Sequence, residues 1–375
     1  MPSPDQQLIL ALNCGSSSLK FGAYRIAGGP PPDGLHNTPE LLCEGEAEEI
    51  GHPNGSFWFK SAGRKDEHPT VYANHTAALA HALELLAKQG LTKFWRATHR
   101  VVHGGPEIRE HQILTPAVLA KLQAAIPFAP LHLPASLEVI AAVSEKMPGL
   151  EQVICLDTAF HRSMPDVART FALPADVRSK GVERFGFHGL SLESILAQLH
   201  PVPAKLVVAH LGNGSSITAI LNGKSIDTSM GLTPTGGVMM GTRTGDLDPG
   251  VMLFLSRHGF AKPEELETLV NRKSGLLGIS GTSSDVRQLI ETRAQPASDL
   301  ALRMFCYQVR KTIASMAAAL AGIDLLVFTG GIGENAEALR HEICQPMKWI
   351  DPFEIRVLPA EEDLQIARIA LSCSK

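Results

Sequence analysis

Short apolar runs separated by polar turns, with longer helical stretches between them, set the hydrophobic pattern of this chain. The runs at residues 8–12, 152–156, 206–210 and 323–329 are predominantly apolar, which is typical of buried strands. Residues 75–88 are rich in alanine and leucine and are followed closely by Gly90. A second segment starts at Thr115 and has a proline at its first helical position. A third, residues 302–321, ends at Gly322. These signals predict helices. Strands alternating with helices predict an α/β fold.

Two of the predicted strands run into turns of the same composition. Gly15-Ser16-Ser17 follows the first strand, Gly214-Ser215-Ser216 follows residues 206–210, and extended segments at residues 19–24 and 217–220 come next. One copy in each half of the chain predicts a duplicated domain. Backbone N–H groups and hydroxyls in such turns can bind anions, and Lys20 adds a positive charge near the first turn. Each turn could also be an ordinary hairpin.

The length of the chain, 375 residues, is sufficient for two hydrophobic cores. Pro148-Gly149 interrupts a predicted helix before the strand at residues 152–156. We therefore expect one domain of residues 1–149, completed by a returning helix at residues 363–375, and a second domain of residues 150–362. Loops are expected at residues 28–38 and 52–56.

Composition narrows the class of function. The net charge is −4 and no basic stripe is present, which argues against nucleic acid and anionic membranes as partners. The six cysteines are scattered, without zinc-finger or CxxC spacing, as expected for a reduced, cytoplasmic protein. The start of the chain has no signal-peptide pattern, and Asp324 interrupts the longest apolar stretch, so no membrane span is expected.

Two common nucleotide-binding motifs fit poorly. Residues 231–236 have the glycine spacing of a Walker A loop, but Gly237 stands where that loop needs lysine. Residues 331–336 match the dinucleotide fingerprint after a predicted strand, but a Rossmann domain needs most of its sheet after that point. Only 39 residues follow Ala336, which argues against an NAD-dependent enzyme.

Four polar residues are candidates for chemistry, each with a structural alternative. Arg100 lies in an apolar, strand-like run, where it needs either a ligand or a salt bridge to a local acid. Asp157 follows a predicted strand, where α/β proteins often carry functional groups, but it could cap a helix. Arg243 lies among glycines and threonines, in a presenting loop or on the solvated surface. His188, between an aromatic residue and a glycine, could be purely structural.

Ten segments, in order from near residue 8 to near residue 370, together resemble the acetate kinase family of acetate and propionate kinases, within the sugar kinase, Hsp70 and actin superfamily. They are NCGSSSLK (from residue 13), HRVVHGG (99), APLHLPA (129), LDTAFH (156), RFGFHG (184), HLGNGSSI (210), DTSMGLTPTGGVMMGTRTGDLDPG (227), GISGTSSDVR (278), FTGGIGEN (328) and LPAEEDLQIAR (358). The resemblance implies two duplicated domains of the ribonuclease H-like type with a central cleft.

The resemblance also implies a function. This is acetate kinase activity, the reversible, Mg²⁺- and ATP-dependent transfer of a phosphoryl group to the carboxylate of acetate, giving acetyl phosphate and ADP. It further implies a cytoplasmic homodimer, with Mn²⁺ as an alternative ion. Propionate or butyrate kinase activity by the same mechanism, or a non-catalytic nucleotide-binding module, are the alternatives.

Roles for individual residues follow from the same resemblance. Catalysis would rest on Asp157, His188, Arg243 and Arg100, with Arg100 also binding the substrate carboxylate. The acyl chain would be surrounded by Val102, Leu131, Phe187 and Pro234. ATP would be bound by Lys20, His210, Leu211, Gly212, Asn213, Gly214, Asp285, Val286, Arg287, Gly331, Ile332, Gly333, Glu334 and Asn335. The metal would be held by Asn13 and Glu362.

The physical chemistry of the reaction agrees with these residue types. A carboxylate with a free pKa of around 4 is already ionised at neutral pH, so Asp157 is expected to orient rather than to act as a strong base. Both reactants are anionic, and the planar fork of arginine suits carboxylate and phosphoryl oxygens alike. Leu133 and Leu190 stand where the family usually has polar residues near the pocket. The preferred acyl chain therefore stays open.

Overall fold

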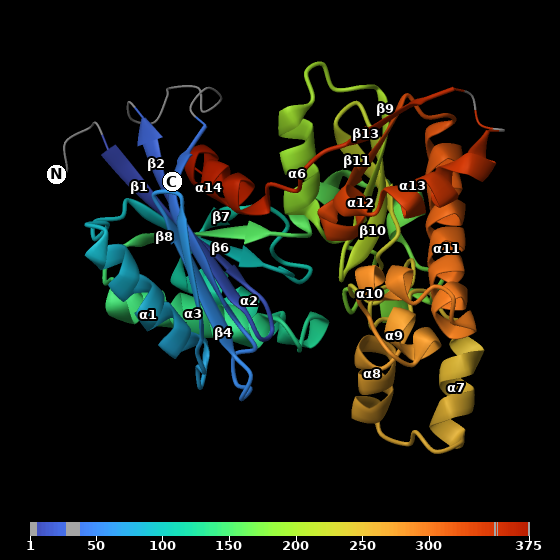
Figure 1. Cartoon of the computed structure of the whole chain (residues 1–375), viewed down its shortest axis with the longest axis horizontal. Coiled ribbons are helices and arrows are strands. Elements are labelled where there is room, and N and C mark those ends of the chain that lie inside the picture. Colours follow the sequence, from blue (N-terminus) through green and yellow to red (C-terminus); the bar gives the residue numbers. More distant parts are fainter. Residues whose placement is uncertain (1–5, 28–37, 349, 351, 374–375) are drawn as a thin grey trace. The chain divides into compact units, whose positions relative to one another are not determined.

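The computed structural model describes residues 6–27, 38–348, 350 and 352–373 (Figure 1). The predicted loop at residues 28–38 lies almost wholly outside these ranges. The chain divides into two compact units, Met1–Ala159 with Glu361–Lys375, and Phe160–Ala360. Each unit has its own sheet and its own hydrophobic core.

The first unit contains a mixed sheet of eight strands in the order β5-β4-β3-β2-β1-β6-β8-β7. The strands are β1 (Gln6–Cys14), β2 (Leu19–Ala27), β3 (Glu40–Glu48), β4 (Ser56–Ser61), β5 (Arg64–Pro69), β6 (Arg96–Val101), β7 (Gln112–Ile113) and β8 (Glu151–Leu156). Strands β1, β6 and β8 are parallel neighbours, whereas the remaining pairs are antiparallel. The carboxyl ends of β1, β6 and β8 therefore lie at one edge of the sheet.

Helices cover both faces of this sheet. Leu10 and Leu12 of β1 share a core with helices α1 (His75–Lys88) and α3 (Leu133–Lys146). Ile9 and Ala11 alternate with them and are equally buried, on the face where α14 (Glu362–Ser372) packs against β1 and β6. Helix α2 (Pro116–Ala124) and the turn η1 (Ile126–Phe128) pack beside α3.

The ends of these helices follow the capping signals in the sequence. The side chain of Asn74 accepts a hydrogen bond from the backbone of Ala77 at the start of α1, and Thr115 does the same for Val118 in α2. Gly90 follows α1 with φ 77°, the left-handed region that glycine adopts at low cost.

The second unit contains a sheet of five strands in the order β11-β10-β9-β12-β13. The strands are β9 (Lys205–Leu211), β10 (Ser215–Leu221), β11 (Lys224–Thr228), β12 (Leu325–Thr329) and β13 (Glu354–Val357). Strands β9 and β10 form an antiparallel hairpin and β9 pairs in parallel with β12, as β1 pairs with β2 and with β6 in the first unit. This shared arrangement agrees with the duplication expected from the two similar turns.

The long helix α11 packs on this sheet and supplies much of its core. The helical elements of this unit are η2 (Ala159–Ser163), α4 (Asp166–Arg169), α5 (Ala175–Arg178), α6 (Gly189–Gln198), α7 (Pro249–Arg257), α8 (Pro263–Arg272), α9 (Gly275–Ser280), α10 (Val286–Glu291), α11 (Pro296–Leu320), α12 (Gly330–Asn335), α13 (Glu337–Cys344) and η3 (Gln345–Met347). The α/β class is thus confirmed. Within the described ranges, no helix combines the length and the apolar character needed to cross a membrane.

The boundaries of the units differ from those expected. Strand β8 pairs with β6 in the first sheet, so residues 150–159 group with the first unit and not with the second. Glu361 and Glu362 also group with the first unit, because α14 starts at Glu362. Pro148-Gly149 is a turn between α3 and β8.

Candidate functional site

Three predicted residues meet at the carboxyl edge of the first sheet. Asn13 lies at the end of β1 and is paired in register with Arg100 of β6, and Asp157 directly follows β8. Because these strands are parallel neighbours, residues far apart in sequence come together at the edge where α/β proteins usually place their chemistry.

Arg100 is held by a bidentate salt bridge. Its Nε lies 3.1 and 3.2 Å from the two carboxylate oxygens of Asp157, its Nη2 lies 2.6 Å from Oδ2, and its Nη1 donates to Asn13 Oδ1 at 3.1 Å. The Asp157 side chain is almost fully buried. The alternative of a salt bridge is therefore realised, but with an acid 57 positions away in the sequence. A guanidinium has five N–H groups, and these bonds use one on each nitrogen, so one N–H on each terminal nitrogen is not engaged by them.

An acidic residue that the sequence analysis did not select joins this group. Asp363 Oδ2 lies 2.5 Å from Lys20 Nζ, and its Oδ1 accepts a hydrogen bond from the Asn13 amide at 3.1 Å. Lys20, expected to contact phosphates, is thus paired with α14. The signal that could have found Asp363 is its place next to Glu362 at the start of the returning helix.

Glu362 lies in the same environment. Burial raises the pKa of its carboxyl to about 7, and the negative charges of Asp157 and Asp363 act in the same direction, whereas Arg100 and Lys20 oppose the shift. Mg²⁺ prefers oxygen ligands and is commonly held by one or two carboxylates together with water and substrate phosphates. The amide oxygen of Asn13 and the carboxylate of Glu362 fit that preference. In the described part of the chain, no group of three or more His, Cys, Asp or Glu is placed to hold an ion by itself.

In the second unit, the turn between β9 and β10 lies against two histidines and an arginine. The turn closes through a hydrogen bond from Gly212 N to Gly214 O at 3.0 Å. A Cβ added to Gly214 would lie 3.1 Å from His188 Nε2 and 3.6 Å from Arg243 Nη1. Glycine therefore permits both side chains to approach the turn. Arg243 Nη1 also donates to Pro234 O at 3.1 Å, which links two predicted site residues.

The two histidine rings are themselves stacked and anchored. The imidazoles of His188 and His210 lie 4.2 Å apart between centroids, with an interplanar angle of 24°. His188 Nδ1 lies 3.0 Å from Ser216 Oγ, and His210 Nδ1 lies 2.9 Å from Ser191 Oγ. His188 adopts a left-handed backbone conformation, φ 59°, at the start of α6, which is uncommon for a non-glycine residue and frequent at functional sites. Neither serine was selected from the sequence.

A pocket of about 900 Å³ in the second unit gathers most of the predicted nucleotide contacts, and its size is within the range of small-molecule sites. Its predicted lining residues are Gly212, Asn213, Asp285, Val286, Arg287, Gly331, Ile332 and Asn335; Ser284, Ile290 and Ala336 also line it but were not predicted. Gly333 and Glu334 do not line it, and Glu334 Oε1 accepts backbone hydrogen bonds from Gly330 and Ala360. Leu211 is likewise absent from the lining and buried in the core of the unit.

The residues expected around the acyl chain are divided between the units. Val102 is buried and Leu131 half-buried in the first unit, whereas Phe187 is buried and Pro234 half-buried in the second. The leucines at unusual positions serve core packing. Leu133 belongs to the core beneath α2 and α3, and Leu190 is fully buried in the first turn of α6.

The sequence of this chain is similar to known proteins along most of its length. The Acetokinase family model matches residues 8–362. The chain belongs to the acetokinase family. It is 43% identical over 345 residues to acetate kinase 2 of Neisseria meningitidis serogroup B, covering 89% of this chain and 84% of that protein. It is 39% identical over 392 residues to the acetate kinase of Rhodopseudomonas palustris strain TIE-1, covering 96% and 97%.

Solved acetokinase-family structures share the fold along the whole chain. The acetate kinase of Porphyromonas gingivalis matches with a TM-score of 0.85 and 34% identity, covering 98% of this chain and 100% of that one. A propionate kinase from Francisella tularensis matches with a TM-score of 0.88 and 35% identity, covering 97% and 98%. The fold class implied by the resemblance, that of the sugar kinase and actin superfamily, is therefore confirmed.

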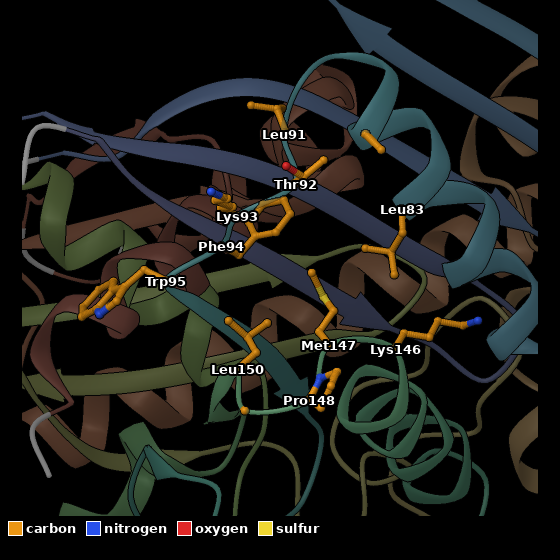
Figure 2. Close-up of a pocket in the computed structure, with 12 residues that line it drawn as sticks. Leu83, Leu91, Thr92, Lys93, Phe94, Trp95, Lys146, Met147, Pro148 and Leu150 are labelled. Carbon is orange, nitrogen blue, oxygen red and sulfur yellow. The ribbon is translucent and has the colours of Figure 1, made fainter. Parts of the chain in front are cut away.

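This acetokinase also has a pocket remote from the predicted residues. It measures about 550 Å³ and lies in the first unit, lined by the end of α1, the α1–β6 connection and the α3–β8 turn (Figure 2). Phe94, Met147 and Leu150 line it from where β6 and β8 begin. Arg100 and Asp157 lie at the other ends of the same strands, so this pocket is separate from them.

Proposed function

We propose that this chain is an acetate kinase, which transfers a phosphoryl group reversibly between ATP and the carboxylate of acetate. The observation that carries the proposal is the arrangement of Arg100, held by the buried Asp157 with N–H groups still available on both terminal nitrogens. A nucleotide-binding module does not need such a fixed guanidinium. A kinase that binds a small carboxylate does, because the fork pairs with carboxylate oxygens.

Different residues of this chain bind the acetate, the transferring phosphoryl group and the nucleoside. Arg100 binds the acetate carboxylate, and Asp157 fixes the plane of its guanidinium instead of removing a proton. His188 and Arg243, which approach the Gly212–Gly214 turn, donate to the oxygens of the transferring phosphoryl group, on which negative charge is spread in the transition state. The pocket that includes Asp285 and Gly331 binds the nucleoside.

Magnesium is part of the proposal. Asn13 and Glu362 would hold the ion, directly or through water, and Mn²⁺ could replace it. When bound, the ion neutralises phosphate charge that would repel the incoming carboxylate. Lys20 and Asp363 then keep Asn13 and the start of α14 in position.

The expected cytoplasmic location and the homodimer also remain proposals. Cys14, Cys43, Cys306 and Cys344 are free thiols, which suits a reducing compartment. The second unit exposes large apolar side chains on α7, α9 and α11, namely Leu253, Phe254, Ile279, Leu300 and Tyr307. Such exposure favours self-association. Light scattering with size-exclusion chromatography would give the mass in solution, and a monomer at micromolar concentration would contradict the dimer.

Propionate kinase activity is the second candidate. The fold similarity to the Francisella tularensis propionate kinase, with a TM-score of 0.88 and 35% identity, favours it. The chemistry of the proposed reaction would be the same.

The test is acyl-phosphate formation from ATP and Mg²⁺ with acetate, propionate or butyrate, trapped as the hydroxamate. Turnover is expected on acetate and should fall by on the order of 10³-fold in Arg243→Ala. Arg303→Ala is the matched control, because Arg303 is exposed and pairs only with Asp299 of its own helix among the described residues. ATP binding without turnover on any acid would contradict the kinase and favour a non-catalytic module.

A further inference from the structure

Two buried serines of the second unit each contact the Nδ1 atom of a histidine. Ser216 lies on β10 and Ser191 on α6, and both side chains are fully buried. Ser216 Oγ lies 3.0 Å from His188 Nδ1, and Ser191 Oγ lies 2.9 Å from His210 Nδ1. Each serine thus contacts the ring nitrogen farther from the Gly212–Gly214 turn, since both Nε2 atoms are the ones near that turn.

The direction of these hydrogen bonds follows from the needs of a buried hydroxyl. Among the residues that the structure describes, Ser216 Oγ has one side-chain hydrogen-bond partner, His188 Nδ1. If Nδ1 carried the proton, the hydroxyl would accept, and its own hydrogen would have no acceptor in a place without solvent. An unmade hydrogen bond at a buried site is costly, so the arrangement favours the hydroxyl as donor and Nδ1 as acceptor.

That direction determines where the imidazole proton lies. A neutral imidazole has one donor and one acceptor nitrogen. With Nδ1 accepting from Ser216, His188 carries its hydrogen on Nε2, beside Gly214. The same reasoning applied to Ser191 places the hydrogen of His210 on Nε2, 4.0 Å from the site where Gly212 would carry a Cβ.

Stacking and the nearby guanidinium disfavour positive charge on both rings at once. The two imidazoles are stacked with centroids 4.2 Å apart, and the Arg243 guanidinium lies close to His188 at Gly214. Two imidazolium ions at that distance would repel each other and the arginine. A neutral ring with its hydrogen on Nε2 donates a hydrogen bond to a phosphoryl oxygen without adding a third positive charge.

We propose that Ser216 is a positioning residue, which donates its hydroxyl hydrogen to His188 Nδ1 and so fixes the neutral tautomer that donates from Nε2 to the transferring phosphoryl group. Ser191 fixes His210 in the same way. The role of the donor rests on the proposed kinase function, whereas the tautomer itself is a property of the protein and can be measured without turnover.

The direct test is nitrogen NMR of the full-length protein labelled with ¹⁵N-histidine, at pH 7.5 and without substrates. The spectrum of His188→Gln identifies the His188 signals among the 15 histidines. The expected result is a protonated Nε2 and an unprotonated Nδ1. A hydrogen on Nδ1, or on both nitrogens, would overturn the proposal, and this measurement needs no serine variant to fold.

Kinetics give the second test. Ser216→Ala should lower kcat by about 10- to 100-fold, as loss of an outer-shell partner commonly does, and change KM for ATP by less than about 3-fold. Ser216→Thr, which keeps a hydroxyl, should recover most of kcat. A loss in KM alone, or equal losses in the Ala and Thr variants, would contradict a positioning role.

The chain contains a matched control. Ser225 is also fully buried, and its Oγ lies 2.9 Å from the Nδ1 of the buried His161, whose Nε2 contacts Phe187 O at 2.9 Å instead of the turn. Ser225→Ala should lower stability while leaving kcat per folded molecule unchanged. If wild-type protein is inactive on all short acids, the kinase proposal fails, and the NMR result still decides the tautomer. If wild type is active and His188 carries its hydrogen on Nδ1, only the present inference fails.

Discussion

His99 gives a prediction about stability that can be worked from the structure. Its ring is buried on β6, one residue before Arg100, and its Nε2 lies 2.8 Å from Gln152 Oε1. Burial lowers the pKa of His99 to about 4, and the hydrogen bond to Gln152 opposes that shift only partly. An unfolded histidine has a pKa of about 6.5. Between these values the unfolded chain binds the proton and the folded chain does not.

The sign and size of the effect follow. Stability from the neutral His99 is fully present above pH 6.5 and declines as the pH falls, until it levels off near pH 4. The pKa difference corresponds to about 3 kcal/mol in total, and the linkage relation gives a loss of about 2 kcal/mol at pH 5 relative to pH 7.5.

The assay compares wild type with His99→Gln, which retains an amide donor but does not titrate. Urea unfolding of the first unit, followed by the fluorescence of Trp58 and Trp95, would be measured at pH 7.5 and pH 5. Other titrating groups contribute to both proteins, so the loss of stability on acidification should be about 2 kcal/mol smaller in the variant. Equal losses, within about 0.5 kcal/mol, would refute the argument that a buried neutral His99 drives acid sensitivity.

Three further changes test the site. Gly214→Ala places a methyl group 3.1 Å from His188 Nε2, so kcat should fall by on the order of 10²-fold in the hydroxamate assay, and an unchanged kcat would show that the approach to the turn is not needed. Arg100→Leu leaves the buried Asp157 unpaired and should lower the free energy of unfolding in urea by about 3–5 kcal/mol. The double variant Arg100→Leu/Asp157→Leu should recover most of that loss, and a double variant as unstable as the single one would contradict this. Asp363→Asn should change stability by less than about 1 kcal/mol because its ion pair with Lys20 is partly exposed, and should raise KM for ATP several-fold because Asp363 helps to keep Asn13 in position; an unchanged KM would contradict that positioning role.

Local patterns in the sequence predicted the elements of this fold well. The predominantly apolar runs correspond to β1, β8, β9 and β12, because a strand covered on both faces needs apolar residues at most of its positions. The helix caps Asn74 and Thr115 can likewise be predicted from the residues next to them. The repeated small-residue turn predicted the duplicated arrangement of β1/β2 and β9/β10.

Local patterns could not predict contacts between residues that are far apart in the sequence. Pro148-Gly149 resembles a linker, but the parallel pairing of β8 with β6 retains that strand in the first sheet. The salt bridge between Arg100 and Asp157 spans 57 positions and the bond from Asn13 to Asp363 spans 350, so no local window contains both partners. Nor could Ser216 be distinguished from other serines before its hydroxyl was placed beside Nδ1 of His188.

The return of the chain to the first unit has a consequence for synthesis. Residues from Glu361 onward complete that unit, and α14 packs against β1 and β6 (Figure 1). Arg96 at the start of β6 donates to the carbonyls of Ala370 and Cys373. On the ribosome, the earliest strands therefore wait for the last fifteen residues while the whole second unit emerges, a delay on the order of 10–40 s at ordinary elongation rates. A nascent chain stalled before Glu361 would present to chaperones a sheet with all its strands but with the face at β1 and β6 not covered by α14.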